Sequence, residues 1–248
     1  MDHLIQKAAQ DLAGTTRAVA LTGAGISVES GIPPFRGKGG LWEKIDPMEF
    51  AHINAFLKDP AKVWHVLIRE MKGMVDNARP NDAHKALARL EQLGILKTII
   101  TQNVDGLHQM AGNTDVIEFH GNFAWQRCMD CGGRCKTAHI DLSQIPPRCE
   151  CGGIYKPDCV FFGEMIPPQL LRRSEQVALD CDIMLVVGTS ALVQPAAFMP
   201  LIAKQAGAKV IEVNPERTLL SDRTSDYIIM GKAGQVMNRL TAEVERLL

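Results

Sequence analysis

Residues 183–190 read Ile-Met-Leu-Val-Val-Gly-Thr-Ser, a run of five apolar residues followed by a glycine and two hydroxyl side chains. An apolar run without polar alternation is typical of a parallel strand that is buried on both faces. Residues 209–213, Lys-Val-Ile-Glu-Val, repeat the signal after a helical stretch at about 197–206. Two such strands joined by a helix indicate a parallel sheet.

Apolar and helical stretches alternate along the rest of the chain. Further short strands are expected at 19–22, 97–101, 116–119 and 159–162. Helices are expected at 2–12, 61–75, 83–93 and from about 232 to the C-terminus. Strands that alternate with helices predict an α/β fold, with a parallel sheet and helices on both of its faces.

The residues with unusual chemistry stand where the expected strands end. They are Gly23-Ala24-Gly25, Gln102-Asn103-Val104-Asp105, His120-Gly121, Gly188-Thr189-Ser190 and Asn214-Pro215. An open parallel sheet binds its ligands beyond the carboxyl ends of its strands. We therefore expect these five segments to converge on one crevice.

The composition is that of an ordinary globular protein, with 46% hydrophobic residues, 22% charged residues and a formal net charge of −1. The chain has no basic tail or stripe, so we expect no direct binding to nucleic acid. The N-terminus lacks the pattern of a signal peptide, and no stretch reaches the length of a membrane span. Seven cysteines in 248 residues suggest a reducing compartment rather than a disulfide scaffold. We expect a cytoplasmic monomer with no membrane contact.

Four cysteines form two close pairs, Cys128-x-x-Cys131 and Cys149-x-Cys151. Two close pairs of thiolates suit tetrahedral Zn²⁺, and a site with four thiolates is structural because it has no open position. Cys135 is a spare thiol that could replace one ligand. The alternative is a redox pair or unrelated buried thiols, but the surrounding glycines and prolines favour metal-binding turns.

The glycine pair after the first strand lets backbone amides approach a pyrophosphate. A dehydrogenase fingerprint would place a third glycine at Val28, but the next glycine is Gly31, and no acidic strand end follows. A tight turn is the simpler alternative for Gly-x-Gly alone. It does not explain the loop at 31–37, which carries Phe35 and Arg36 beyond two prolines.

Six motifs run in order along the chain. They are Gly23-Ala24-Gly25-Ile26-Ser27, Gly31-Ile32-Pro33-Pro34-Phe35-Arg36-Gly37, Thr101-Gln102-Asn103-Val104-Asp105-Gly106-Leu107-His108, His120-Gly121, Phe161-Phe162-Gly163-Glu164 and Gly188-Thr189-Ser190. Together they resemble the sirtuins, which are NAD-dependent protein-lysine deacylases. The tight Cys149-x-Cys151 pair and Pro34 depart from the usual pattern without touching the expected chemistry.

The resemblance implies a Rossmann-like NAD-binding domain of residues 1–34, 80–122 and 158–248. It implies a small zinc-binding lobe of residues 35–79 and 123–157. NAD and an acyl-lysine protein or peptide would enter the cleft between them from opposite sides. The family reaction moves the acyl group to ADP-ribose and releases nicotinamide and free lysine.

By resemblance, His120 is the general base and Asn103 and Asp105 belong to the nicotinamide pocket. Phe35 covers the reacting ribose, and Arg36 lies in the same cofactor loop. The further cofactor contacts are Gly23, Ala24, Gly25, Ile32, Gln102, Gly188, Thr189, Ser190, Asn214, Lys232 and Ala233. The substrate clamp comprises Val160, Phe161, Phe162, Gly163, Glu164 and Val193.

Simpler interpretations stay open for several of these residues. Asn103 and Asp105 could merely cap a helix at 105–111. Phe161 and Phe162 could be core, and Glu164 a solvated charge.

The small-lobe helix bears on the acyl group. Sirtuin-like enzymes that prefer acidic acyl groups carry a Tyr and, three residues later, an Arg in this helix. Leu67 and Glu70 stand at those places here, and Arg69 should point about 100° away. We therefore expect a neutral-acyl enzyme, with acetyl-lysine accepted and longer apolar chains tolerated.

Other function classes are a mono-ADP-ribosyltransferase, a nicotinamide-cofactor oxidoreductase and a zinc-ribbon module for nucleic acid. The gap between Gly25 and Gly31 disfavours the oxidoreductase, and the charge balance disfavours the nucleic-acid module.

Overall fold

The computed structural model describes residues 1–35 and 39–248, without the side chains of residues 68 and 69. Arg36 and the side chain of Arg69 therefore lie outside the described part of the chain.

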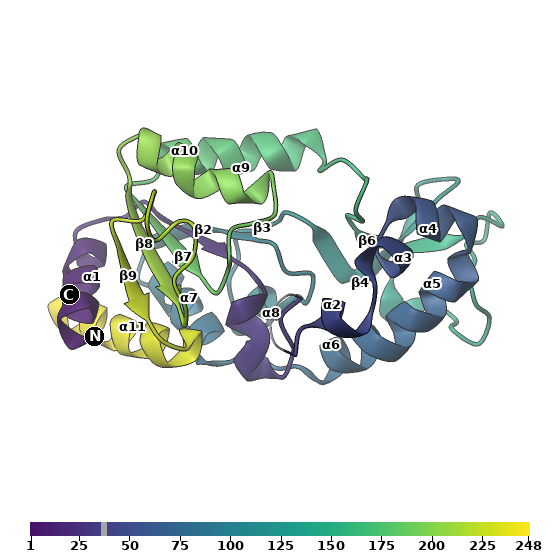
Figure 1. Cartoon of the computed structure of the whole chain (residues 1–248), viewed down its shortest axis with the longest axis horizontal. Helices are drawn as coiled ribbons and strands as arrows, with labels where there is room; N and C mark the ends of the chain where they lie inside the picture. The colour runs from purple at the N-terminus through teal and green to yellow at the C-terminus, as the bar shows by residue number, and fades with distance from the viewer. Residues whose placement is uncertain (36–38) are drawn as a thin grey trace.

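A six-stranded parallel sheet forms the larger part of the molecule (Figure 1). Its strand order is β3-β2-β1-β7-β8-β9, and every neighbouring pair is parallel. The strands are β1 (Ala18–Thr22), β2 (Leu96–Thr101), β3 (Val116–Glu118), β7 (Ile183–Val187), β8 (Lys209–Asn214) and β9 (Tyr227–Met230). All five residues of β7 are buried, as its unbroken apolar run predicts.

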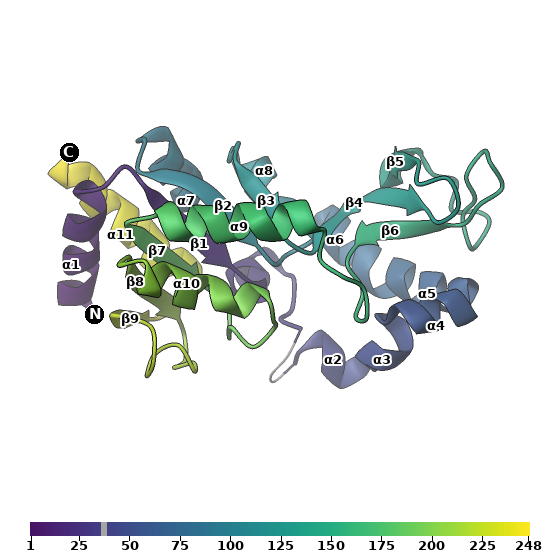
Figure 2. The ribbon, with the colours of Figure 1, turned by 90° about the horizontal axis from the view of Figure 1, so that it is seen from above.

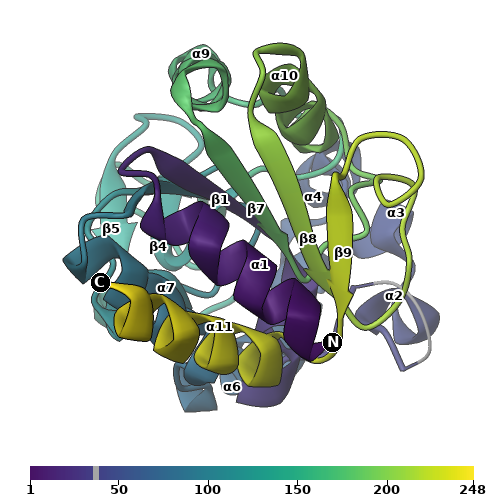
Figure 3. The ribbon, with the colours of Figure 1, turned by 90° about the vertical axis from the view of Figure 1, so that its left-hand side faces the viewer.

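Helices cover both faces of this sheet (Figure 3). One face carries α1 (Asp2–Ala13), α7 (Asp82–Gln92) and α11 (Ala233–Leu247). The other carries α9 (Pro168–Asp180) and α10 (Met199–Gln205). Successive residues of β1 divide between the two cores: Ala18 and Ala20 pack with one set of helices, and Val19 and Leu21 with the other. The alternation of side chains along a strand explains this division.

A smaller lobe lies beside the main sheet and combines two segments that are distant in the chain (Figure 2). Its helices are α2 (Leu41–Lys44), α3 (Pro47–Phe50), α4 (Ile53–Lys58), α5 (Pro60–Val66), a π-helical turn (Leu67–Lys72) and α6 (Gly73–Asn77). Its antiparallel sheet has the order β5-β4-β6, formed by β4 (Gly121–Cys128), β5 (Arg134–Lys136) and β6 (Tyr155–Cys159).

An apolar core joins these two segments. Phe56, Trp64 and Phe123 are buried in it, and Trp64 Nε1 donates a hydrogen bond to Tyr155 O at 2.7 Å. The small lobe therefore has a hydrophobic core of its own.

The strand expected at 159–162 is wrong. β6 ends at Cys159 and belongs to the small sheet. Residue Phe162 instead exchanges two backbone hydrogen bonds with the small lobe, donating to Ala51 O at 2.8 Å and accepting from Ile53 N at 3.0 Å. Phe161 N donates to the Glu164 carboxylate. Together, these hydrogen bonds occupy backbone groups that would otherwise pair with a neighbouring strand, so β6 does not continue past Cys159.

Among the strands of the main sheet and the helices that cover it, α9 and the edge strand β9 were not expected. In the small lobe, α2, α3, α4, β4, β5 and β6 were not expected either. The remaining short elements are 3₁₀ turns at Ala24–Ser30, Thr137–His139 and Ala196–Phe198, and α8 (Leu107–Ala111). Within residues 1–35 and 39–248, no helix combines the length and apolarity needed to cross a bilayer.

Candidate active site and metal centre

A single large cavity of about 1720 Å³ opens at the carboxyl ends of the parallel strands. All five expected strand ends contribute to its wall, through residues that include Gly23, Gln102, His120, Gly188 and Asn214. The small lobe and the segment after β6 supply the opposite wall. The predicted residues that line the cavity are Gly23, Ala24, Gly25, Phe35, Gln102, Asn103, His120, Val160, Phe161, Phe162, Gly163, Glu164, Gly188, Thr189, Ser190, Val193, Asn214, Lys232 and Ala233. Ile32 and Asp105 do not line it.

Two glycine turns meet at the floor of the cavity. Gly25 N donates to Gly188 O at 2.7 Å, and a Cβ on Gly25 would lie only 2.7 Å from that oxygen. Gly188 has φ of 62°, and a Cβ there would lie 2.2 Å from Ile26 N. Only glycine allows the two backbones to approach this closely. The result is a floor of bare backbone, which suits the pyrophosphate of a dinucleotide.

Polar side chains beside this floor are held by the strand ends themselves. Gln102 Nε2 donates to Thr189 Oγ1 at 3.0 Å, and Asn214 Nδ2 donates to Thr189 O at 3.2 Å. At the far end, Gly234 N at the start of α11 donates to the carboxylate of Glu29 at 2.7 Å. Glu29 lines the cavity and was not predicted.

Asn103 and Asp105 have different environments. Asn103 is 5% exposed, and its amide donates to Gly23 O and to Ser27 Oγ, each at 3.1 Å. Asp105 accepts from Leu107 N at the start of α8 and from Ser27 Oγ at 2.7 Å. Burial raises the pKa of the Asp105 carboxyl.

The capping interpretation therefore applies to Asp105 and not to Asn103. Asp105 also connects to the cavity through Ser27 and Asn103. The role of Ser27 was not predicted, because its partners lie 76 and 78 residues away.

His120 lies between β3 and β4, where both parts of the molecule meet. Its Nδ1 donates to Gln102 O at 3.0 Å, so Nε2 remains as the proton acceptor. Burial lowers the pKa of His120, although the hydrogen bond to Gln102 opposes the shift. The next residue must be glycine, because Gly121 has φ of 82° and a Cβ there would lie 2.0 Å from Asp158 O. Burial thus favours the uncharged ring, and the hydrogen bond to Gln102 O holds it in one orientation.

Aromatic side chains line the mouth of the cavity. Phe35 stacks on Trp42 with ring centroids 5.3 Å apart, and Trp42 lies 6.3 Å from Phe162. Phe161 is 7% exposed and packs edge-on against Phe56 at 5.9 Å. Phe161 therefore belongs to the core of the small lobe as well as to the wall of the cavity.

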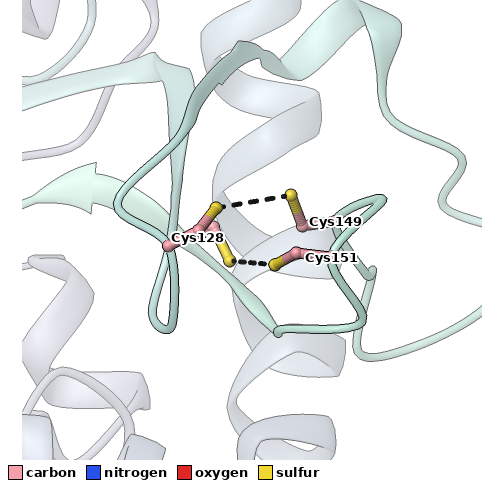
Figure 4. A group of neighbouring side chains, drawn as sticks. Cys128, Cys149 and Cys151 are labelled. Atoms are coloured by element: carbon pink, nitrogen blue, oxygen red, sulfur yellow. Dashed lines mark hydrogen bonds between the residues drawn. The ribbon is translucent and has the colours of Figure 1, made fainter.

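The four expected cysteines form one cluster, with the Sγ atoms of Cys128, Cys131, Cys149 and Cys151 all within 4.8 Å of one another (Figure 4). The separations are 3.5 Å for Cys128–Cys151 and 3.8 Å for Cys131–Cys149. Zn–S bonds of about 2.3 Å in a tetrahedron place the sulfur atoms roughly 3.8 Å apart. These four side chains therefore fit a structural zinc ion.

Cys135 does not belong to this cluster. Its thiol donates to Lys136 O, and it is absent from the only set of potential metal ligands found among the described residues. Gly153 leaves room for the metal site, because a Cβ there would lie 2.6 Å from Cys128 Sγ.

Comparison with known proteins agrees with this geometry. The model of the Sir2 family matches residues 23–195. The chain is 47% identical to NAD-dependent protein deacylase 1 of Archaeoglobus fulgidus, over 98% of this chain and 99% of that protein.

Two solved structures share the fold over all of this chain. One is a Sir2 homolog–NAD complex, with a TM-score of 0.91, 46% identity and 94% of its chain covered. The other is Sir2Af2 bound to a myristoylated histone peptide, with a TM-score of 0.82, 39% identity and 98% of its chain covered. The match to the family model and the full-length identity show that this chain belongs to the Sir2 family.

Proposed function

We propose that this protein is an NAD-dependent protein-lysine deacylase that transfers an acyl group to ADP-ribose and releases nicotinamide and free lysine. The observation that carries the proposal is the meeting of His120, the Asn103 pocket and the bare glycine floor in one cavity. Membership of a family whose relatives are named deacylases supports it.

The test is to incubate the protein with an acetyl-lysine peptide, with and without NAD, and to identify the products by mass spectrometry. We expect deacetylated peptide, nicotinamide and acetyl-ADP-ribose only when NAD is present. ADP-ribose attached to protein would instead indicate a mono-ADP-ribosyltransferase. Production of NADH would indicate an oxidoreductase.

The cavity suits NAD, which supplies the ADP-ribose that accepts the acyl group. In this proposal Gly23, Ala24, Gly25, Gly188, Thr189 and Ser190 hold the phosphates and riboses with Gln102 and Asn214, while Lys232 and Ala233 lie by the adenine. Asn103 orients the nicotinamide through its free amide oxygen, since its N–H groups are occupied. Phe35 excludes water from the reacting ribose.

His120 would act as the general base toward a ribose hydroxyl. The hydrogen bond from Nδ1 to Gln102 O leaves Nε2 free to take the proton. An extended peptide would lie between two sets of cavity residues, Val160, Phe161, Phe162, Gly163 and Glu164 in one and Val193 in the other.

Asp105→Asn should slow cleavage of NAD and weaken inhibition by nicotinamide. The substitution keeps the shape but removes the buried carboxylate that accepts from Ser27. Loss of a buried hydrogen bond to a charged group costs about 1.5–3 kcal/mol, or roughly 10- to 100-fold. The measurements are nicotinamide exchange and the inhibition constant of nicotinamide.

Ser27→Ala is the matched variant for this prediction, because Ser27 is the link between Asp105 and Asn103. It should weaken nicotinamide inhibition in the same way. If nicotinamide inhibits purely in competition with NAD, and its inhibition is unchanged in Asp105→Asn, then Asp105 serves only as a helix cap.

The small-lobe wall of the cavity favours a neutral acyl group. Leu67, Met71 and Phe123 line it, whereas Glu70 does not. Among the described residues that line the cavity, the basic side chains are Arg217 and Lys232, both outside the small lobe. Against the described side chains, an acidic acyl group would therefore bury its carboxylate among apolar groups without a cationic partner, which is costly.

Acetyl-lysine should be a better substrate than succinyl-lysine by about 10-fold or more in kcat/KM, because of this desolvation cost. Myristoyl-lysine should be accepted against Leu67 and Met71. The measurement compares the three acyl forms of one peptide. As a control, Glu70→Gln should leave the order unchanged. Succinyl above acetyl would contradict the proposal and would point to a helix register that brings Arg69 into the cavity.

We also propose the division into a Rossmann-like domain (1–34, 80–122 and 158–248) and a small lobe (35–79 and 123–157), because separate hydrophobic cores support it. The seven unpaired cysteines support a reducing compartment, which we propose is the cytoplasm. We further propose a monomer that binds no nucleic acid directly, consistent with the near-neutral charge. Light scattering of the purified protein tests the oligomeric state.

A further inference from the structure

Lys156 is a buried lysine in β6, five residues after the metal ligand Cys151. Its side chain is only 7% exposed. Its ammonium group donates to Cys159 O at 2.7 Å, to the Glu164 carboxylate at 2.9 Å and to Pro157 O at 3.2 Å. It also lies 4.3 Å from the centre of the Phe161 ring. Lysine is almost never buried unless it is paired, and here all three of its N–H donors have partners.

Every partner of this ammonium group lies in the segment 157–164, which leaves the small sheet and forms the wall of the cavity. The Glu164 oxygen that accepts from Lys156 also accepts from Phe161 N at 2.7 Å. One cation and one carboxylate thus close the segment into a compact turn.

The same turn is attached to two other parts of the molecule. Val160 N donates to His120 O at 2.9 Å, which joins the turn to the backbone of the proposed base. Phe162 exchanges hydrogen bonds with Ala51 and Ile53 of the small lobe. A change in the turn would therefore displace the peptide-binding wall relative to His120.

We propose that Lys156 is a positioning residue that holds the Val160–Glu164 wall in the shape that receives the acyl-lysine peptide. This inference rests on the proposed deacylase function. The hydrogen bonds of Lys156 go to the wall and not to the zinc cysteines, so the role concerns the peptide rather than the metal. The glycine turns and Asn214, which we propose hold NAD, follow strands of the main sheet and are not part of segment 157–164.

The test compares Lys156→Met with the wild-type protein. Methionine keeps the apolar stem but removes the charge, and it leaves the half-buried Glu164 carboxylate without its cationic partner. Removing one partner of a largely buried, hydrogen-bonded charge pair is unfavourable because the other charge is left uncompensated, and here that charge lies in the cavity wall. We expect the peptide KM to rise by about 10-fold or more, with ADP-ribose affinity within about twofold of wild type and one zinc bound.

Lys136→Met is the matched control, because Lys136 is an exposed lysine of the same small sheet. It should leave the peptide KM unchanged. Lys156→Arg keeps the positive charge and should restore part of the lost peptide affinity.

Glu164→Gln gives a second route that does not depend on the Lys156→Met protein alone. Added to Lys156→Met, it removes the unpaired carboxylate, so the double variant should bind peptide better than Lys156→Met does. A merely additive loss would contradict the coupling of the two side chains.

Three other results would overturn the inference: an unchanged peptide KM in Lys156→Met, a loss of zinc from it, or an equal loss of ADP-ribose affinity. If Lys156→Met does not fold, an unchanged peptide KM in Glu164→Gln overturns it instead. A wild-type protein without deacylase activity would refute the proposed function itself.

Discussion

His120→Ala should lower the rate of deacetylation by about 10²–10⁴-fold, the usual contribution of a general base. The ring accepts a proton at Nε2 because Nδ1 is occupied by Gln102 O, and alanine offers neither nitrogen. The backbone at this position should stay in place, since Val160 N bonds to His120 O and not to the ring. The measurement is kcat with a saturating acetyl-lysine peptide.

Two comparisons separate this role from a structural one. Binding of ADP-ribose and exchange of nicotinamide should suffer much less than deacetylation, because the base acts after the nicotinamide bond is broken. His3→Ala is the control, as His3 is exposed on α1. Near-normal deacetylation by His120→Ala would remove this residue from the mechanism.

The pH profile gives an independent signature of the same residue. Burial lowers the pKa of His120 below the usual value of about 6.5. A base must be unprotonated, so kcat/KM should be maintained above this range and fall as pH drops through the lowered pKa. We expect the midpoint of the acid limb below pH 6.5, and this limb should be lost in His120→Ala.

Cys128→Ser should release the zinc ion and unfold the small lobe, the second large effect. Metal binding by small zinc modules is worth about 10–16 kcal/mol in apparent free energy, which is folding free energy when the site forms only on folding. Cys128 ends β4, the central strand of the small sheet, so loss of the metal should also disturb β6 and the cavity wall. The measurements are zinc content by mass spectrometry and thermal unfolding.

Cys135→Ser is the matched control because Cys135 lies in the same sheet but outside the cluster. It should retain one zinc ion and the wild-type unfolding temperature, while Cys151→Ser should behave like Cys128→Ser. Zinc loss from Cys135→Ser with a harmless Cys151→Ser would show that the fourth ligand is assigned incorrectly.

Local features of the sequence predicted much of this molecule. The apolar runs at 183–187 and 209–213 identified two central strands, because a strand buried on both faces shows its burial in its own residues. Parallel strands end at one edge of the sheet, so the polar strand ends could be placed in one cavity before any contact was known. Cysteine spacing predicted the metal cluster for a similar reason, since close pairs form local turns.

Less regular elements were harder to predict. In α9, the fully buried residues are Ser174 and Ala178, and the half-buried Leu170, Leu171 and Val177 complete its apolar face, so its helical spacing was present in the sequence but was not predicted. β9 is a four-residue edge strand. The prediction of a strand at 159–162 was wrong because the backbone of Phe162 forms its hydrogen bonds with Ala51 and Ile53, more than 100 positions away in the chain.

The parallel sheet, the edge of the sheet that carries the site and the two cysteine pairs could be inferred from local patterns in the chain. The partners of the polar side chains, in contrast, depend on how distant parts of the chain pack together. Asp105 accepts from Ser27, which is 78 residues away, and Asn103 donates to Gly23, which is 80 residues away. The ammonium group of Lys156 donates to Glu164. The burial of a residue can be read from the local spacing of apolar side chains. A hydrogen bond between distant residues forms only when the packing of the whole chain brings donor and acceptor together.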